Sequence, residues 1–384
     1  MMDMIKKISV LYVCPEVNFV GASKSLYNMI EALRDYVRPI VLFSMKGEVY
    51  DYFVENDIRC IVVPFFYLWE KPKRLITILH HPSKSQFYRY WKIDRDCAVT
   101  VKNILGDTRI DIVHSNTTIA TVGVDLARVL HAKHVWHVRE YLDLDYGIDV
   151  FRGRKRLRKL INSAHARIVI TNSVLQHWKL TTKSTHVIYN AVRHKYEMSQ
   201  ELEKEKYFLF ASADLSETKG TSFAIRSFAR SGLKNQGYKL KILGRCDEEY
   251  KYTLDKLITD FQLNGVIELL GYQTNVKEFY TRATAYLMTS KYEAMGRVTV
   301  DAMFYGCPVI ARATGGSAEI IQHGYNGYMF MNENECAFWM NQIISNEEQI
   351  QQMIENAFRE ANENFSVEKY GEKIMKVYQL ILDI

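Results

Sequence analysis

The sequence lacks the cysteine and hydrophobic patterns that mark metal-binding, disulfide-bonded and membrane-spanning chains. Its six cysteines are scattered over 384 residues and no two form a Cys-x-x-Cys pair, so zinc and redox motifs have no support. Most lie in apolar runs and are expected to be small buried residues of a reducing compartment. No apolar run approaches the ~18 residues of a membrane-spanning helix, and no segment is of low complexity. With 48% hydrophobic and 24% charged residues, the composition is that of a globular protein.

The segment near the amino end, where two lysines precede an apolar run at 8–13, only loosely resembles a signal peptide. The run is too short and has no Ala-x-Ala-like cleavage site after it, which favours a first β-strand instead. We therefore expect a cytoplasmic protein.

Charge is distributed unevenly along the chain. Residues 1–195 carry 30 Lys and Arg against 18 Asp and Glu, a net charge of +12. Residues 196–384 carry 20 against 26, a net charge of −6, and ten of the eleven histidines fall in the first part. A basic half joined to an acidic half suggests two domains that face different partners.

Apolar runs and amphipathic segments alternate twice along the chain, separated by a polar, charged segment at 193–206. Strands are expected at 7–14, 39–45, 59–65, 111–115, 133–138, 166–171, 185–189, 207–211, 238–243, 266–269, 285–290 and 308–313. Helices are expected at 21–34, before 105, at 118–130, after 152, and at 221–230, 248–263, 276–282, 296–305 and 317–323, with a mostly helical tail at 332–384 broken near Phe365. This alternation predicts two doubly wound α/β units, each with a parallel sheet.

Two carboxylates eight residues apart, Glu293 and Asp301, follow the apolar run at 285–290. Glu293 is expected on the loop at the carboxyl end of that strand, and Asp301 two turns into the helix that begins near Gly296. Ligands bind at such a crevice in open α/β sheets. The amides of residues 297–299 would be unpaired at the helix start and so available to a phosphate.

Residues 292–303, Tyr-Glu-Ala-Met-Gly-Arg-Val-Thr-Val-Asp-Ala-Met, resemble the Glu-x7-Glu motif of the family 4 retaining glycosyltransferases, which have the GT-B fold. Four more segments resemble family pieces in the same order, at 187–192, Lys219-Gly220, 314–320 and 364–370. Five motifs in order are far more specific than one. The resemblance is strong over 187–384 and weaker over 1–186.

The resemblance implies two Rossmann-like domains facing across a cleft. Residues 1–192 would bind the acceptor, 193–206 would link the domains, 207–364 would bind the nucleotide sugar, and a helix at 365–384 would cross back onto the first domain. It also implies transfer from a UDP- or GDP-sugar with the departing phosphate taking the acceptor proton, and therefore no protein base, no metal and no cofactor.

A nucleoside diphosphate leaves with added negative charge, which cations and amides must stabilise when no metal does. The family implies that Glu293 lies near the sugar and that Asp301 grips the ribose. The predicted catalytic residues are Glu293, His137, Lys219 and Arg297. The predicted donor-binding residues are Gly21, Lys219, Gly296, Arg297, Val298, Asp301, Gly315 and Gly316.

Two positions depart from the family pattern. Asp301 stands where the family has Glu, one methylene longer, so the ribose contact could be looser or bridged by water. Many members also carry an Arg shortly before Lys-Gly, whereas residues 212–216 contain none. We predict that Arg297 supplies the missing charge.

The first half offers further candidates at expected strand ends. His137 resembles a family histidine near the donor sugar and acceptor, and the alternative is a histidine of the surface or core whose hydrogen bonds are satisfied within the protein. Arg139 and Glu140 either contact the acceptor or form an ion pair with each other. Asn116 and His114 either face the acceptor or cap a loop. In the second half, Glu319 is a ligand or an acid in the first turn of a helix, and Arg245 reaches the nucleotide or is solvated.

Two Asp-x-Asp segments, at 94–96 and 143–145, mimic a metal motif of the other large glycosyltransferase fold. Neither follows a clear buried strand, so both are expected to be surface acids.

The acceptor is indicated by an aromatic and basic stretch at 65–92 and a basic block made of Arg152, Arg154, Lys155, Arg156, Arg158 and Lys159. Either these residues are a solvated face, or they bind an anionic membrane that holds a polyprenyl-diphosphate-linked saccharide. No nucleic-acid motif accompanies the charge, so nucleic acid is not an expected partner. The hypothesis is a peripheral enzyme at the inner face of the plasma membrane, acting in surface polysaccharide synthesis. The alternatives are a soluble glycosyltransferase that acts on a small molecule or protein, and a catalytically weak subunit that binds a partner.

Overall fold

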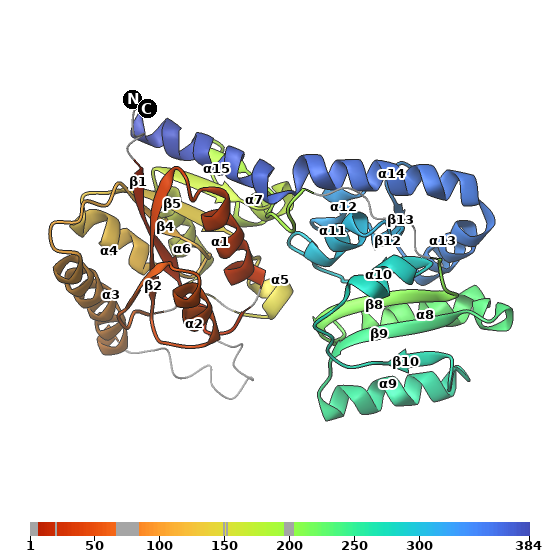
Figure 1. Ribbon diagram of the computed structural model, residues 1–384. Helices are drawn as coiled ribbons and strands as arrows, with labels where there is room; N and C mark the ends of the chain where they lie inside the picture. Colours follow the sequence, from red (N-terminus) through yellow and green to blue (C-terminus); the bar gives the residue numbers. More distant parts are fainter. Residues whose placement is uncertain (1–6, 20, 67–83, 149, 151–152, 196–202) are drawn as a thin grey trace. The chain divides into compact units, whose positions relative to one another are not determined.

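A computed structural model describes residues 7–19, 21–66, 84–148, 150, 153–195 and 203–384, with only the backbone of 84–91. The chain divides into two compact units (Figure 1). Unit 1 comprises Met1–Ala191 and Val367–Ile384, and unit 2 comprises Val192–Ser366.

The described part of unit 1 is built on a seven-stranded parallel sheet in the order β3-β2-β1-β4-β5-β6-β7. Its strands are β1 Ile8–Cys14, β2 Val37–Phe43, β3 Arg59–Val62, β4 Ile112–Ser115, β5 Lys133–Val138, β6 Ala166–Val169 and β7 Thr185–Val187. Its helices are α1 Gly21–Ala32, α2 Glu48–Glu55, α3 Lys84–Leu105, α4 Val122–Val129, α5 Asp143–Tyr146, α6 Arg154–Asn162, α7 Asn172–Trp178 and α15 Val367–Leu382. Strand β1 is buried along its whole length, as expected when helices cover both faces of a parallel sheet.

Unit 2 repeats this plan with a six-stranded parallel sheet in the order β10-β9-β8-β11-β12-β13. Its strands are β8 Tyr207–Asp214, β9 Lys239–Arg245, β10 Ile267–Leu269, β11 Ala285–Met288, β12 Val309–Arg312 and β13 Tyr328–Phe330. Its helices are α8 Thr221–Ser231, η2 Leu233–Gln236, α9 Glu248–Asp260, α10 Lys277–Arg282, α11 Arg297–Phe304, α12 Ser317–Ile320, α13 Glu333–Ser345 and α14 Glu347–Asn364.

The last helix, α15, packs into the core of unit 1 although it follows all of unit 2 in sequence (Figure 1). Its apolar residues recur at helical spacing, and Tyr370, Ile374 and Tyr378 are buried. Gly371 allows close contact with α1, because a Cβ atom there would come within 2.6 Å of Ala32 Cβ. Any larger side chain at this position would push the two helices apart.

Both sheets change winding direction between their first strand and its later neighbour, at β1/β4 in unit 1 and at β8/β11 in unit 2. The chain leaves the carboxyl ends of two adjacent strands in opposite directions at such a point, which opens a crevice where ligands bind. Of the predicted site residues, Gly21 and Asn116 follow β1 and β4, and Lys219 and Glu293 follow β8 and β11.

The alternating pattern is confirmed, and several details differ from expectation. The helix expected at 118–130 begins only at Val122, because both the amide and the hydroxyl of Thr118 donate to Glu140 and hold residues 116–118 at the sheet edge. Helices α2, α5 and α7, the short helix η2 and strand β13 were not predicted. Within the described ranges, no helix is both long enough and apolar enough to cross a membrane.

Candidate active site

The first group of predicted residues meets at the β8/β11 crevice of unit 2. Lys219 lies on the loop after β8, and its Nζ is 3.1 Å from Oε2 of Glu293, on the loop after β11. The two side chains are 33% and 19% exposed, so the pair is open to a ligand but partly shielded from water. The structure thus brings together a predicted phosphate-binding cation and the first carboxylate of the motif.

Two glycines let the surrounding loops pack tightly. Gly220 has a φ of 79°, and a Cβ atom there would lie 2.2 Å from the carbonyl oxygen of Thr289. Gly316 donates its backbone N–H to the carbonyl oxygen of Glu293 at 2.7 Å, and its Cβ atom would lie 2.6 Å from the oxygen of Ala294. Because a side chain fits at neither glycine, the positions of Lys219 and Glu293 depend on this packing.

Helix α11 begins beside this pair. Gly296 precedes it in the left-handed region at a φ of 83°, which favours glycine. The amide of Thr299 already donates to the Gly296 oxygen, so the prediction of three unpaired amides is wrong for this residue. Predicted residues Arg297 and Val298 are partly buried at the helix start, where the peptide dipoles favour negative charge.

Two hydroxyl groups near the crevice were missed by the sequence reasoning. Oγ1 of Thr299 and Oγ1 of Thr314 are buried, and neither has a hydrogen-bond partner in the described part of the chain. Thr314 precedes the glycine pair, Gly315 and Gly316. Buried hydroxyls normally have partners, so these two are available for a hydrogen bond with water or with a ligand.

The second carboxylate, Asp301, pairs with a residue that was expected only to be part of a linker. Nε and Nη2 of Arg193 both lie 2.8 Å from Oδ1 of Asp301. The guanidinium also stacks on the ring of Tyr305, with Cζ 4.2 Å from the ring centroid. Sequence reasoning could not find this pair, because the two residues are 108 positions apart.

In unit 1, His137 lies at the end of β5 in a buried polar network. Its Nδ1 is 3.2 Å from Nη2 of Arg139 and 3.3 Å from Nε2 of His114, whose Nδ1 is 2.7 Å from the hydroxyl of Tyr378. Arg139 can only donate, so Nδ1 of His137 accepts and we assign its proton to Nε2. That Nε2 is buried without a partner in the described part of the chain. The described residues therefore leave one ring nitrogen of His137 available for a further hydrogen bond.

Burial and nearby charge keep both histidines neutral. The pKa of His137 is well below its ordinary value, mainly through burial and then through the charge of Arg139, and the pKa of His114 is lowered for the same reasons. His137 thus offers a neutral N–H donor.

Arg139 is 4% exposed and hydrogen bonds to neutral groups around it. It donates to the carbonyl oxygen and to Oδ1 of Asn116, to Asn190 and to the hydroxyl of Tyr370. Of the two alternatives for Arg139 and Glu140, the mutual ion pair is not formed, because Glu140 accepts from Thr118. Arg139 is therefore a buried member of this hydrogen-bond network.

The predicted acceptor-side residues lie together with the Gly21 turn. Asn116 donates to the carbonyl oxygen of Ala22, next to predicted donor-side residue Gly21. Burial raises the pKa of Glu140 to about 7, and the hydrogen bonds from Thr118 oppose this rise. Burial also raises the pKa of Glu16, a residue after β1 that was not predicted and that accepts from the thiol of Cys14.

Other candidates fall outside these groups. Arg245 is 62% exposed and pairs with Asp214, which agrees with its solvated alternative. Glu319 is partly buried in the first turn of α12. Asp94 is not the expected surface acid, because it is buried and accepts hydrogen bonds from the amide of Phe66 and from Thr121. Among the described residues, no group of three or more His, Cys, Asp or Glu side chains could hold a metal ion.

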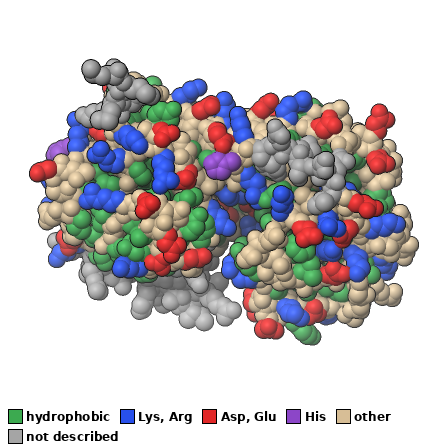
Figure 2. Space-filling view, in the orientation of Figure 1, with side chains coloured by type: hydrophobic (Ala, Val, Ile, Leu, Met, Phe, Trp, Pro, Cys, Tyr) green, Lys and Arg blue, Asp and Glu red, His purple; other side chains and the backbone are tan. Residues whose placement is uncertain are grey.

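The basic block forms most of α6. Arg154 pairs with Asp143 and stacks on Trp178, whereas Lys155, Arg156 and Lys159 are exposed. Residue Arg152 and most of the aromatic stretch at 65–92 lie outside the described side chains. In Figure 2, lysine, arginine and acidic side chains are interspersed on the visible face of each unit.

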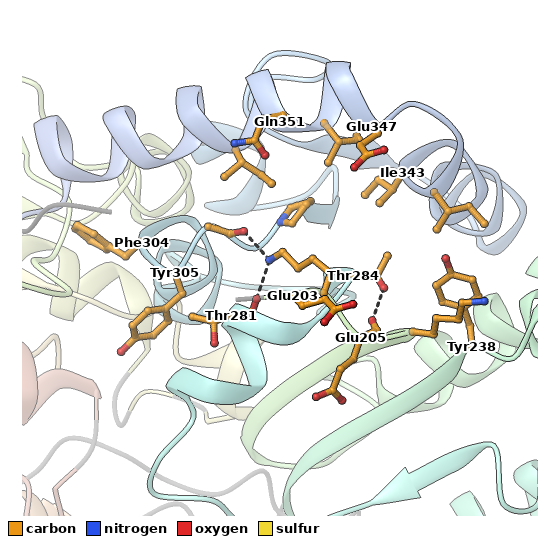
Figure 3. Close-up of a pocket in the computed structure, with 17 residues that line it drawn as sticks. Glu203, Glu205, Tyr238, Thr281, Thr284, Phe304, Tyr305, Ile343, Glu347 and Gln351 are labelled. Atoms are coloured by element: carbon orange, nitrogen blue, oxygen red, sulfur yellow. Dashed lines mark hydrogen bonds between the residues drawn. The ribbon is translucent and has the colours of Figure 1, made fainter. Parts of the chain in front are cut away.

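A cavity of about 650 Å³ lies at the opposite, amino edge of the unit 2 sheet (Figure 3). Isoleucines of α13 and α14 form one wall, and Tyr238 and Thr284 line the cavity beside strand starts. Nζ of Lys204 donates to the oxygens of Thr281 and Gly306, at the ends of α10 and α11, each at 2.9 Å. This cavity is separate from the carboxylates at the other edge.

Residues 192–360 match the family model for glycosyl transferases group 1. The chain is 27% identical over 291 residues to an uncharacterized glycosyltransferase of Methanocaldococcus jannaschii, covering 73% of this chain and 79% of that protein. It is 28% identical over 182 residues to the N-acetyl-alpha-D-glucosaminyl L-malate synthase of Bacillus anthracis, covering only 47% of each chain. Among solved structures, Anabaena HepE in complex with UDP matches with a TM-score of 0.79 and 18% identity, over 97% of this chain and 100% of that chain. At that identity the likeness establishes the fold.

Proposed function

We propose that this chain, which has the GT-B fold and matches group 1 glycosyltransferases over residues 192–360, transfers a sugar with retention of configuration from a UDP- or GDP-sugar. The proposed acceptor is a saccharide or a lipid-linked saccharide of a surface polysaccharide. The observation that carries this proposal is the Lys219–Glu293 pair beside the start of α11, held by Gly220 and Gly316.

The donor diphosphate would bind where positive charge and amides gather in unit 2. Lys219, Arg297 and the start of α11 would stabilise the charge that develops on the leaving phosphate. Glu293 would then exchange its bond with Lys219 for hydroxyls of the sugar, and Asp301 would accept from the ribose. The complex of HepE with UDP supports a nucleotide ligand for this fold.

His137 would serve as a hydrogen-bond donor to a sugar hydroxyl. Its unpartnered Nε2–H and lowered pKa suit a neutral donor rather than a base. In a front-face reaction the departing phosphate oxygen takes the acceptor proton, so the protein need not supply a base.

Nucleotide binding is the first test. A thermal-shift screen with UDP, GDP, ADP and CDP should single out one diphosphate. A ligand at 100 times its dissociation constant stabilises the folded state by about 2.7 kcal/mol. Failure of all four to shift the melting temperature at millimolar concentration would refute the donor site.

Turnover is the second test, through slow hydrolysis of one nucleotide sugar without acceptor. Arg297→Ala should abolish transfer while the melting temperature stays near that of the wild type. An Arg297→Ala variant with near-normal turnover would contradict its role. A wild-type protein that binds nucleotide without hydrolysis or transfer would favour the catalytically weak alternative.

Metal independence is part of the same proposal, because Lys219, Arg297 and helix amides supply the positive charge. Activity should survive EDTA. Loss of activity that manganese restores would overturn this point.

The acceptor proposal includes peripheral binding to an anionic membrane through α6. Each Lys or Arg near such a surface contributes about 1 kcal/mol. Exposed Lys155 and Lys159 provide the test, since replacing both with Gln should reduce sedimentation with anionic liposomes about tenfold or more at low salt. Wild-type protein that does not sediment would instead favour a soluble acceptor, as the partial similarity to the malate synthase also allows.

A further inference from the structure

Arg193 makes three contacts near the carboxyl end of α11. Its backbone forms a parallel bridge with Ser366, and its guanidinium stacks on Tyr305. Its two nitrogens meet Oδ1 of Asp301 at 2.8 Å. Asp301 and Tyr305 are four residues apart on the helical path, so they lie on the same side and share one guanidinium.

The contact is more than an exposed ion pair. The Asp301 side chain is 19% exposed and that of Arg193 34% exposed. A planar guanidinium with two donors on one oxygen orients a carboxylate more strongly than an ammonium does. Stacking on the ring further restricts the side chain.

We propose that Arg193 is a positioning residue that sets the orientation of Asp301 for the ribose hydroxyls of the donor. This inference rests on the proposed function of Asp301 as the ribose-binding acid. A carboxylate has two oxygens and about four acceptor sites, so bonds to Arg193 at Oδ1 are compatible with further bonds to a diol.

The pair also explains how a short acid works at this position. Aspartate reaches one methylene less far than glutamate but has fewer rotamers to restrict. With its direction fixed by Arg193, Asp301 is prepared for the ribose before the nucleotide arrives. Preorganisation of this kind improves affinity by reducing what must be ordered on binding.

The test compares affinities for the selected ribonucleoside diphosphate and its 2′-deoxy counterpart. Arg193→Met should weaken binding of the ribonucleotide about tenfold and lower its preference over the deoxynucleotide by a similar factor. The donor KM should rise while kcat changes less than threefold, because the chemistry lies at the sugar. Arg193→Lys keeps the positive charge but loses the two-pronged guanidinium, so its affinity for the ribonucleotide should lie between those of the wild type and Arg193→Met.

A double-mutant cycle separates positioning from general support of the fold. In an Asp301→Asn background, Arg193→Met should change ribonucleotide affinity by less than twofold. Arg230→Met is the matched control, since Arg230 also pairs with a carboxylate that is 19% exposed, Glu333, at 2.9 Å. This control should leave the ribose preference unchanged.

The outcomes are distinct. If the wild-type protein binds no nucleoside diphosphate, that result refutes both the proposed function and this inference. Binding with an unchanged ribose preference in both Arg193 variants overturns the inference alone. Arg193→Met could also lower ribonucleotide affinity equally in the wild-type and Asp301→Asn backgrounds, with a lowered melting temperature. That result would assign Arg193 a purely structural role and would overturn the inference as well.

Discussion

Replacement of Lys219 by Met tests the central electrostatic feature of unit 2. The change removes the ammonium 3.1 Å from Glu293 Oε2 but keeps the length and apolar stem of the side chain. The Glu293 carboxylate, whose side chain is 19% exposed, then lacks this cation. Two separate consequences follow, one for stability and one for the reaction.

The effect on stability should be small. A partly exposed pair of this kind contributes about 0–1 kcal/mol, because water and salt screen it. The effect on nucleotide binding should be larger. Two like charges 4 Å apart interact by about 4 kcal/mol at an effective dielectric constant of 20, so Glu293 without the Lys219 ammonium would repel a diphosphate. Loss of a donor aimed at the developing charge lowers kcat by about 10²–10³.

The double variant Lys219→Met/Glu293→Gln separates these contributions. Removing the carboxylate as well as the ammonium abolishes the repulsion, so nucleotide affinity should recover by at least tenfold relative to Lys219→Met. Turnover should not recover, because the cation for the leaving phosphate is still missing. Calorimetry with the nucleoside diphosphate and steady-state kinetics with the nucleotide sugar measure the two effects.

Activity of Lys219→Met within threefold of wild type would refute the reasoning. The same holds if the double variant binds the nucleotide no better than the single variant does, since the repulsion would then be absent. A melting temperature close to the wild-type value is required in either case, and it distinguishes loss of charge from loss of fold.

Two further predictions concern packing and pH. Gly316→Ala should lower kcat/KM by tenfold or more, because its Cβ atom would lie 2.6 Å from the oxygen of Ala294 and displace the loop that carries Glu293. The φ of Gly316 is −64°, which alanine adopts without strain, so the loss would come from this collision. Gly324→Ala, at a φ of 79° with nothing within 4 Å, controls for backbone strain without a collision, and equal kinetics for both variants would contradict the prediction. Burial raises the pKa of Asp94 to about 7 from 3.8, so the folded state holds a proton that the unfolded state releases. Stability should therefore fall as pH rises from about 4 to about 7, and Asp94→Asn should reduce that loss by on the order of 1–3 kcal/mol in urea titrations at pH 5 and 8. An unchanged pH dependence in Asp94→Asn would show that this carboxyl titrates normally.

The parts of the site that follow local sequence were predictable. The apolar run at 285–290 and Gly296 predict a strand, a loop and a helix start, and the structure has β11 and α11 there. Strand alternation also places Lys219 and Glu293 at the same sheet edge, because parallel strands end together. The contact between Lys219 and Glu293 follows from topology and not from side-chain detail.

The remaining features depend on contacts that no local pattern encodes. Tyr378 reaches His114 across 264 positions, and Arg193 reaches Asp301 across 108. The sequence predicts Asp94 to be a surface acid, because its Asp-x-Asp segment follows no clear buried strand. In the fold it accepts an amide and a hydroxyl from two loops, which stabilise the buried carboxyl.

The two units use charge in different ways, and this difference constrains the mechanism. In unit 2 the carboxylates Glu293 and Asp301 each have a cation, so an incoming diphosphate meets compensated acids and can exchange partners at low cost. In unit 1 the buried charge of Arg139 is hydrogen bonded to neutral acceptors and lowers the pKa of His137. A histidine held neutral in this way cannot supply a cation near pH 7, and its Nδ1 is already occupied by donors. Its capacity for chemistry is reduced to one N–H, which is compatible with the proposed recognition of a sugar hydroxyl and with the proposed transfer of the acceptor proton to the departing phosphate.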